Sequence, residues 1–154
     1  MPFSDRGTPK FPSLTFDFTA KVEHLLKRAE DLPAFAEAGC LFVISAVESL
    51  SGRVLEILDK QHTREDVEIA LAACRDAGIV MRPTWVAFTP WTTLEDYREV
   101  LDFVEVNNLV DHVDPVQFAI RLLIPPGSWL AEHAETLPHR GDLDEAALSY
   151  RWTH

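Results

Sequence analysis

The sequence contains few cysteines, and this scarcity excludes several kinds of metal centre. Its 154 residues include only 2 cysteines, Cys40 and Cys74. Structural zinc sites and iron–sulfur clusters take their ligands from cysteine and histidine groups at short spacings, and these two cysteines fit neither pattern. Cys40 opens an apolar stretch and Cys74 lies on the apolar face of a predicted helix. We therefore interpret both as small buried hydrophobic residues.

Positive charge is also scarce. The chain has 14 lysines and arginines against 25 aspartates and glutamates, a formal net charge of -11. Such an acidic chain is poorly suited to bind nucleic acid phosphates or an anionic membrane surface. No apolar run approaches the ~20 residues that a membrane-spanning helix needs. The start, "MPFSDRGTPKFPS", lacks the apolar stretch of a signal peptide. We expect a cytoplasmic protein with no nucleic acid or membrane partner.

Complete catalytic motifs are missing as well. The sequence has no glycine-rich phosphate loop and no nucleophile elbow, and its 6 histidines are dispersed. What is present is a hydrophobic share of 47% over a length typical of one globular domain. We expect a flexible leader over residues 1–13, an α/β domain over residues 14–135 and a C-terminal extension over residues 136–154.

Apolar patterning predicts four strands separated by helices. The strands are expected at residues 14–18, 41–46, 79–88 and 115–124, where β-branched and aromatic residues form short apolar runs. Helices are expected at residues 21–39 with a break at Pro33, at 51–60, after the cap Thr63, and after the cap Thr93. A short helix is also expected at residues 129–135, and residues 136–154 give no clear pattern.

The predicted order, β-α-β-αα-β-α-β, implies parallel strands joined by helical crossovers. The strands are nearly continuous apolar runs, which is typical of parallel sheets covered on both faces. In such folds, ligands bind at the carboxyl ends of the strands. Polar side chains in and just after the predicted strands are therefore the candidate site residues: Lys21, Glu48, Ser49, Arg82, Thr84, Gln117 and Arg121.

Charged residues inside buried strands need a partner, because an unpaired buried charge is costly. One interpretation is an internal ion pair between Glu48 and either Arg82 or Arg121. The other is that these side chains face a ligand. Both interpretations can hold, since a site without ligand can pair its charges with each other. Trp85 and Trp91 flank the end of the third predicted strand, and we expect them to pack in the core rather than stack on a cofactor.

Several ordered motifs resemble the radical S-adenosylmethionine (radical SAM) family. The segment Ala46-Val47-Glu48-Ser49 is similar to a strand end of that family, and Lys60-Gln61-His62-Thr63 and Ala77-Gly78-Ile79 are similar to the turn and helix end that follow it. Further along, "WVAFTPWTTLEDY" and "IRLLIPPGSWL" resemble the segments at its fifth and sixth strands. The resemblance covers about residues 14–135 and implies a partial (β/α) barrel made of strands three to six.

The resemblance implies roles for individual residues. It places Glu48 where the family contacts the cofactor ribose, with Lys21 at the same mouth, and Arg82 where a polar side chain reaches the methionine carboxylate. Gln117 and Arg121 would lie near the adenine or substrate side. The family's three-cysteine motif for the [4Fe–4S] cluster is absent. S-adenosylmethionine and [4Fe–4S] are thus cofactors of the parent family, and none is assigned to this chain.

Two functional interpretations remain open. In the first, the chain derives from an enzyme that cleaves S-adenosylmethionine reductively, and by itself it is inactive for lack of cluster ligands. In the second, it is a metal-free α/β module that binds a small ligand or completes the barrel of a partner protein. Because a set of parallel strands has two open edges, we expect self-association or a partner chain that supplies the missing strands. The substrate cannot be assigned, and whether the chain is an enzyme stays open.

Overall fold

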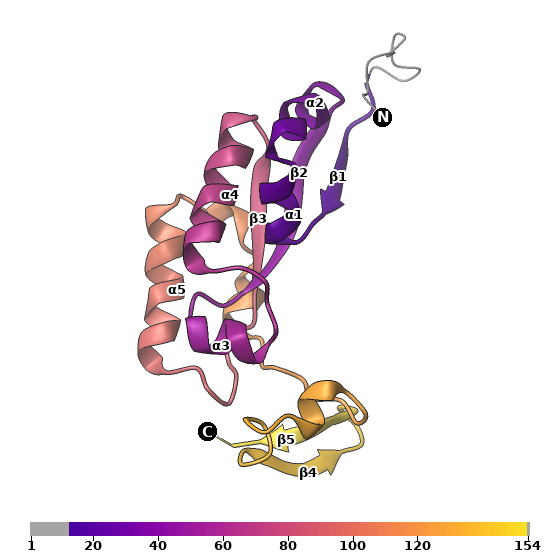
Figure 1. Ribbon diagram of the computed structural model, residues 1–154, viewed down its shortest axis with the longest axis vertical. Helices are drawn as coiled ribbons and strands as arrows, with labels where there is room; N and C mark the ends of the chain where they lie inside the picture. The colour runs from indigo at the N-terminus through magenta and orange to yellow at the C-terminus, as the bar shows by residue number, and fades with distance from the viewer. Residues whose placement is uncertain (1–12, 154) are drawn as a thin grey trace.

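The computed structural model describes residues 13–153 and contains a parallel three-stranded sheet (Figure 1). Its strands are β1 (Phe16–Thr19), β2 (Cys40–Glu48) and β3 (Val80–Trp85), in the order β1-β2-β3. Both pairings are parallel, with Thr19 opposite Ile44 and Ile44 opposite Arg82. The predicted α/β class with helical crossovers is therefore confirmed. Most of the predicted leader, residues 1–12, lies outside the described residues.

The helices between the strands follow the predicted pattern. The structure has α1 (Val22–Lys27) and α2 (Leu32–Glu37), which are separated by a 3-10 turn at Ala29–Asp31, and then α3 (Gly52–Ile57), α4 (Arg64–Asp76) and α5 (Leu94–Val106). Thr63 and Thr93 cap α4 and α5, each in a reciprocal capping box with the aspartate three residues on. After α2 the chain turns at Gly39, where φ is +98° and an added Cβ would lie 2.6 Å from the Leu14 carbonyl oxygen. Only glycine fits that turn.

The main core lies on one face of the sheet. Buried side chains of β2 and β3, among them Val43, Val47 and Trp85, pack against the apolar faces of α1, α2, α4 and α5. Trp85 meets Phe103 of α5 edge to face, with 6.0 Å between ring centroids. The helices accordingly cover this face as one layer (Figure 1). Cys40 and Cys74 are both buried in this core, as predicted.

The opposite face of the sheet is only partly covered. Residues that alternate with the core positions are half-buried on β2 and β3 and exposed on β1. Because side chains alternate across a strand, these residues share one face. This open face carries Asp17, Thr19, Phe42, Ile44, Ala46, Arg82 and Thr84.

The fourth predicted strand does not form as a regular strand, which corrects the prediction for residues 115–124. Residues Pro115–Ala119 form a 3-10 turn beside β3, and only Phe88 and Arg121 make an isolated parallel bridge. The physical reason lies in two side chains. Pro115 has no N–H to donate, and the Gln117 side-chain oxygen accepts from the Trp85 N–H at 2.9 Å. In a regular parallel sheet, a backbone carbonyl of the neighbouring strand would accept from the Trp85 N–H instead.

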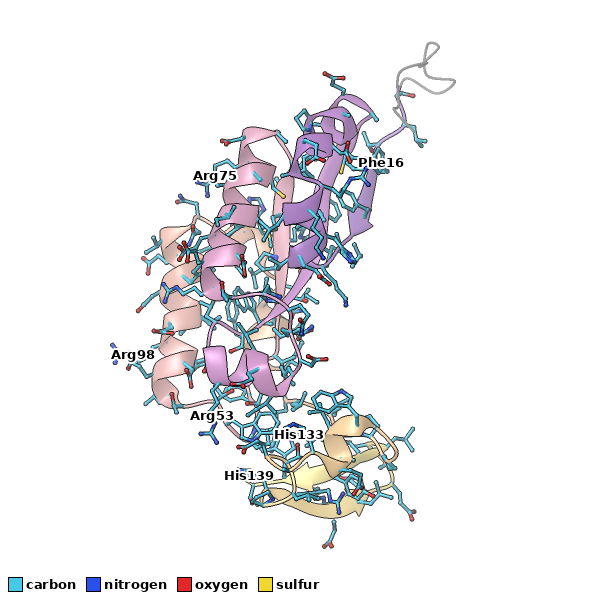
Figure 2. The ribbon with its side chains drawn as sticks, in the orientation of Figure 1. Phe16, Arg53, Arg75, Arg98, His133 and His139 are labelled. Carbon is cyan, nitrogen blue, oxygen red and sulfur yellow. The ribbon has the colours of Figure 1, made fainter. Side chains whose placement is uncertain are left out.

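Residues 123–153 form a separate small unit at the end of the sheet where the strands finish (Figure 1). It contains a 3-10 turn at Trp129–Glu132, in place of the predicted short helix, and an antiparallel hairpin of β4 (Arg140–Asp144) and β5 (Ser149–Trp152). Buried Trp91 donates its indole N–H to the Glu135 carbonyl at 3.0 Å. Arg53 of α3 also pairs with the Glu135 carboxylate at 3.1 Å, close to the labelled His133 (Figure 2).

None of the helices within residues 13–153 is both long enough and apolar enough to cross a membrane.

Candidate functional site at the carboxyl ends of the strands

The strand ends form a polar rim, because parallel strands finish at the same edge of a sheet. Thr19 ends β1 and Glu48 ends β2. A hollow of about 190 Å³ lies at this edge. Its lining comes from the start of α1, from β2 and from the loop that follows α3: Lys21, Glu23, Ala46, Leu58, Asp59, Lys60, Gln61 and His62. Lys21 is thus at the rim, as the sequence predicts, with its ammonium 3.8 Å from Glu23.

Glu48 is partly buried at this rim and is paired with a residue that sequence reasoning did not propose. Its Oε1 lies 3.0 Å from the Lys60 Nζ, and the two side chains are 20% and 26% exposed. Neither of the predicted partners, Arg82 and Arg121, makes this ion pair, so that interpretation is corrected. In the residues that the structure describes, Oε2 of Glu48 has no hydrogen-bond partner and can accept from a ligand.

Ser49 has a local structural contact. Its side chain is almost fully buried, and its hydroxyl oxygen accepts from the Ser51 N–H at 3.1 Å. This bond shapes the turn between β2 and α3, because serine hydroxyls stabilise such turns. Ser49 therefore stabilises the turn next to the rim.

Arg82 and Thr84 lie on the open face of the sheet rather than at its rim. The register places Arg82 opposite Ile44, roughly 13 Å along β2 from Glu48 at a typical rise per residue. Its guanidinium lies 3.6 Å from Asp114, donates to the His112 carbonyl at 3.4 Å, and sits 5.2 Å from the Phe42 ring centroid. Thr84 is opposite Ala46, two residues nearer the rim than Arg82. Arg82 is partly exposed, so a ligand can reach it.

The two remaining candidates are engaged by backbone groups. Gln117 accepts from the Trp85 N–H through its side-chain oxygen. Arg121 is exposed, lies 4.2 Å from the Trp152 ring centroid and donates to the Trp152 carbonyl at 3.5 Å. The guanidinium thus holds the C-terminal hairpin. The structure brings Lys21 and Glu48 to one rim, places Arg82 and Thr84 on the open face, and puts Gln117 and Arg121 into structural contacts.

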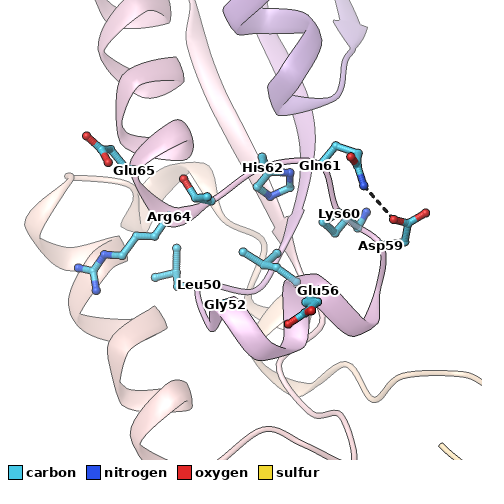
Figure 3. Close-up of a pocket in the computed structure, with 11 residues that line it drawn as sticks. Leu50, Gly52, Glu56, Asp59, Lys60, Gln61, His62, Arg64 and Glu65 are labelled. Carbon is cyan, nitrogen blue, oxygen red and sulfur yellow. Dashed lines mark hydrogen bonds between the residues drawn. The ribbon is translucent and has the colours of Figure 1, made fainter. Parts of the chain in front are cut away.

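The loop after α3 contributes two rim residues that sequence reasoning missed, Lys60 and His62. The same loop also lines a larger hollow of about 600 Å³, which lies between α3 and the start of α4 (Figure 3). His62 is buried, and its Nε2 lies 3.2 Å from the Val47 carbonyl oxygen. Burial lowers the pKa of His62. The signal for both residues was the Lys60-Gln61-His62-Thr63 motif, which the sequence analysis used only for the resemblance.

The described residues do not fit an iron–sulfur cluster. A [4Fe–4S] cluster of this kind needs several thiolates at one place. Cys40 and Cys74 are buried in the core, and burial raises the pKa of both thiols, that of Cys74 to about 11. Across residues 13–153, no three or more His, Cys, Asp and Glu side chains come together to hold a metal ion.

The fold is similar to part of the cobalamin-dependent S-adenosylmethionine radical enzyme OxsB. The structure of OxsB with aqua-cobalamin and S-adenosylmethionine bound matches with a TM-score of 0.69 and 19% identity, over 91% of this chain and 26% of that one. The structure of OxsB with aqua-cobalamin alone matches with a TM-score of 0.65. This likeness shows the fold alone, a partial radical SAM-like α/β fold, and the three-stranded sheet of the described residues does not close into a barrel.

Two curated proteins are similar in sequence. Bacteriochlorophyllide d C-8(2)-methyltransferase of Chlorobaculum tepidum is 31% identical over 75 residues, which is 47% of this chain and 17% of that protein. Ribosomal protein uS12 methylthiotransferase RimO of Pelotomaculum thermopropionicum is 31% identical over 67 residues, 42% of this chain and 15% of that protein. The chain therefore spans less than a fifth of the curated relatives that it matches. No family model matches the sequence.

Proposed function

We propose that this chain forms one wall of an S-adenosylmethionine-binding barrel of the radical SAM type. The observation that carries the proposal is the one-sided cover of the sheet: helices pack on one face, while the other presents half-buried Arg82 and Thr84. In a (β/α) barrel the face away from the helices is the interior, and ligands bind toward the carboxyl ends of the strands. The likeness to OxsB, whose structure has S-adenosylmethionine bound, supports the same assignment.

Within this proposal, two side chains have roles at the ligand. The Glu48 carboxylate accepts hydrogen bonds from the ribose hydroxyls through its free Oε2, and the Arg82 guanidinium pairs with the methionine carboxylate. The separation of roughly 13 Å along the strand that the register gives these residues suits an extended ligand with a hydroxyl-bearing sugar near one end and a carboxylate at the other. Charge-assisted hydrogen bonds of this kind are stronger than neutral ones.

Titration of the chain with S-adenosylmethionine by calorimetry tests the proposal. We expect saturable binding that weakens by about tenfold or more in Glu48→Gln and in Arg82→Met, since a hydrogen bond to a charged group contributes about 1.5–3 kcal/mol. The matched control is Arg98→Met on α5, which removes an exposed ion pair with Glu95. Absence of binding by the unaltered chain, or equal loss in the control, would refute the proposal.

We also propose that the chain does not cleave S-adenosylmethionine by itself, because its two buried cysteines do not fit a cluster. The experiment is anaerobic reconstitution with iron and sulfide, followed by addition of S-adenosylmethionine and a strong reductant. We expect no 5′-deoxyadenosine above the level of a Cys40→Ser/Cys74→Ser variant. Formation of 5′-deoxyadenosine that depends on either cysteine contradicts this part of the proposal.

A second role, completing a sheet with strands from elsewhere, is favoured by the free edge of β1. Strand β1 pairs only with β2, so its other edge has unpaired backbone groups among the described residues. Open edges and uncovered sheet faces favour pairing with further strands. We propose that a second copy, a partner chain or another part of a longer protein supplies them. Analytical ultracentrifugation tests the second copy: a sedimenting mass equal to that of one chain at every concentration excludes it.

A further inference from the structure

Glu48 has an unusual backbone conformation for a long side chain. Its φ is +69°, in the left-handed region that residues other than glycine, asparagine and aspartate seldom adopt. The Ser49 N–H donates to the Val47 carbonyl at 2.9 Å, across this one residue. Together these features make a γ-turn of the rare form with positive φ, which is strained. Strain of this kind persists only where the surroundings hold it in place, and such residues cluster at functional sites.

Hydrogen bonds on both sides of Glu48 hold this turn. The Val47 carbonyl also accepts from His62 Nε2 at 3.2 Å, and since a carbonyl cannot donate, Nε2 carries the proton. On the other side, the Glu48 carbonyl accepts from the Val86 N–H at 2.9 Å. The pairing of β2 with β3 shifts register between Ala46 and Glu48, which lets the turn leave the sheet.

Lys60 then fixes the Glu48 side chain. Its ammonium approaches Oε1 at 3.0 Å, and both side chains are about three-quarters buried or more, so the pair is less screened than one at the surface. Lys60 is itself held, because its N–H donates to the Leu55 carbonyl at 2.8 Å and the preceding residue, Asp59, turns the chain with φ of +51°. The carboxylate is left with one oxygen engaged and one free.

We propose that Lys60 and His62 are positioning residues, which hold Glu48 in its left-handed conformation with Oε2 aimed at the ligand hydroxyls. His62 holds the backbone of the turn and Lys60 holds the carboxylate. This inference rests on the proposed function for its ligand, but the holding of the turn stands on geometry that needs no ligand. Both residues come from one short loop, so a single segment sets the orientation of the strand-end acid.

The first experiment measures the turn without ligand, by hydrogen exchange of the Ser49 amide in solution. We expect exchange about fivefold faster in His62→Leu, since one hydrogen bond contributes about 1 kcal/mol. His62→Gln, whose side-chain amide can donate to the same carbonyl, restores part of the protection. Exchange of the Leu71 amide in α4 reports whether a variant is still folded. If both His62 variants leave Ser49 unchanged while folded, the proposal is overturned.

The second experiment measures the hydroxyl preference of the rim, with adenosine and 2′,3′-dideoxyadenosine as probes. We expect the unaltered chain to prefer adenosine, Lys60→Met to lose about tenfold of that preference, and Lys60→Arg to keep most of it. In Glu48→Gln, Lys60→Met should add little, because the two residues act as one unit. An unchanged preference in Lys60→Met overturns the assignment of Lys60.

Failure of the proposed function gives a different result. If the unaltered chain binds neither probe, the adenosyl site is wrong, and the Ser49 exchange rates alone then decide the positioning roles. Faster exchange in Lys60→Met with recovery in Lys60→Arg supports the proposal, and equal rates in all variants overturn it.

Discussion

Two regions of this molecule are stabilised in different ways. In residues 14–106, regular strands and helices bury most of their apolar side chains in the main core, and a smaller cluster of Val54, Ile57 and Trp91 packs against Leu122 and Leu130 of the second region. In residues 107–153, 3-10 turns and a hairpin have less apolar packing, and several of their contacts are hydrogen bonds between side chains and backbone groups. Examples are Tyr97 to the Phe118 carbonyl at 3.2 Å, the Ile124 N–H to Ser149 at 2.7 Å and the Trp152 indole to the Leu122 carbonyl at 2.8 Å.

The two kinds of contact predict different extents of cooperative unfolding. Apolar packing is shared by many side chains, so loss of one member affects the whole core. A side-chain bond to a single carbonyl holds one point, so its loss frees one segment. Substitutions in the two regions should therefore differ both in how much of the chain they affect and in the size of their effect on the free energy of unfolding.

The largest effect is expected from Trp85→Ala in the first region. Trp85 is 1% exposed and packs against Phe103, so its loss leaves a cavity. We expect a cost of about 3–5 kcal/mol in the free energy of unfolding, measured by urea denaturation with circular dichroism. Trp152→Ala in the second region should cost less and leave the helices intact. Equal losses of helical signal in both variants would remove the contrast.

A smaller and more local effect is expected from Trp91→Phe. This variant keeps most of the aromatic packing but removes the donor that satisfies the Glu135 carbonyl. Glu135 is an exposed residue, so the cost is that of one lost hydrogen bond, about 0.5–1.5 kcal/mol. Hydrogen exchange should become faster in residues 129–152 and stay unchanged in β2 and β3. Faster exchange throughout the sheet would show that the two regions unfold together.

Loss of a helix cap tests the first region at a single polar contact. Thr93→Ala removes the hydroxyl that accepts from the Asp96 N–H, while the backbone N–H of residue 93 can still donate to the Asp96 carboxylate, and should cost about 1 kcal/mol. The cost should appear in global unfolding, because α5 belongs to the shared core. As a control on the same helix, Arg98→Ala removes only an exposed pair and should change stability little. A Thr93→Ala cost seen only as local fraying of α5 would contradict this expectation.

The smallest effect expected is a pH dependence from His62, a side-chain-to-backbone contact inside the first region. Burial lowers the pKa of His62 below its ordinary value of 6.5, so the unfolded chain binds the proton more readily. Stability should therefore be full above about pH 6.5 and fall as pH drops from there toward the lowered pKa. Lys60, Asp66 and Glu48 also act on the ring.

Urea midpoints at several pH values measure this slope, with His62→Gln as the control that should flatten it. If the midpoint of the unaltered chain stays constant or rises between pH 6.5 and 5, relative to His62→Gln, then His62 is not the group responsible.

The sequence predicts the first region well, because the spacing of apolar residues shows which face of each strand or helix packs in the core. Strands and helices with one apolar face follow from spacing, and the caps Thr63 and Thr93 follow from their aspartate partners. The second region was poorly predicted, because its contacts join residues far apart in sequence. No local pattern shows that Gln117 replaces a strand bond or that Arg121 stacks on Trp152.

The candidate site was predicted only in part, because chain order shows which residues follow a strand but not which distant residues contact them. Strand-end logic found Lys21 and Glu48 at the rim, since chain order alone places them there. It could not find the partner of Glu48, because Lys60 reaches it only through the turn after α3. It also could not give the distance of Arg82 from the strand ends, because strand register, which the sequence leaves open, places Arg82 opposite Ile44.

The two buried thiols have a practical consequence. Because Cys40 and Cys74 are inaccessible and burial raises the pKa of both, electrophilic dyes should leave them unmodified in the native protein. A cysteine introduced at a surface position would then be the one reactive handle among residues 13–153. Two introduced cysteines, one on α2 and one on the hairpin, would carry a pair of fluorophores. Single-molecule energy transfer between them could then measure whether the small C-terminal unit moves relative to the sheet.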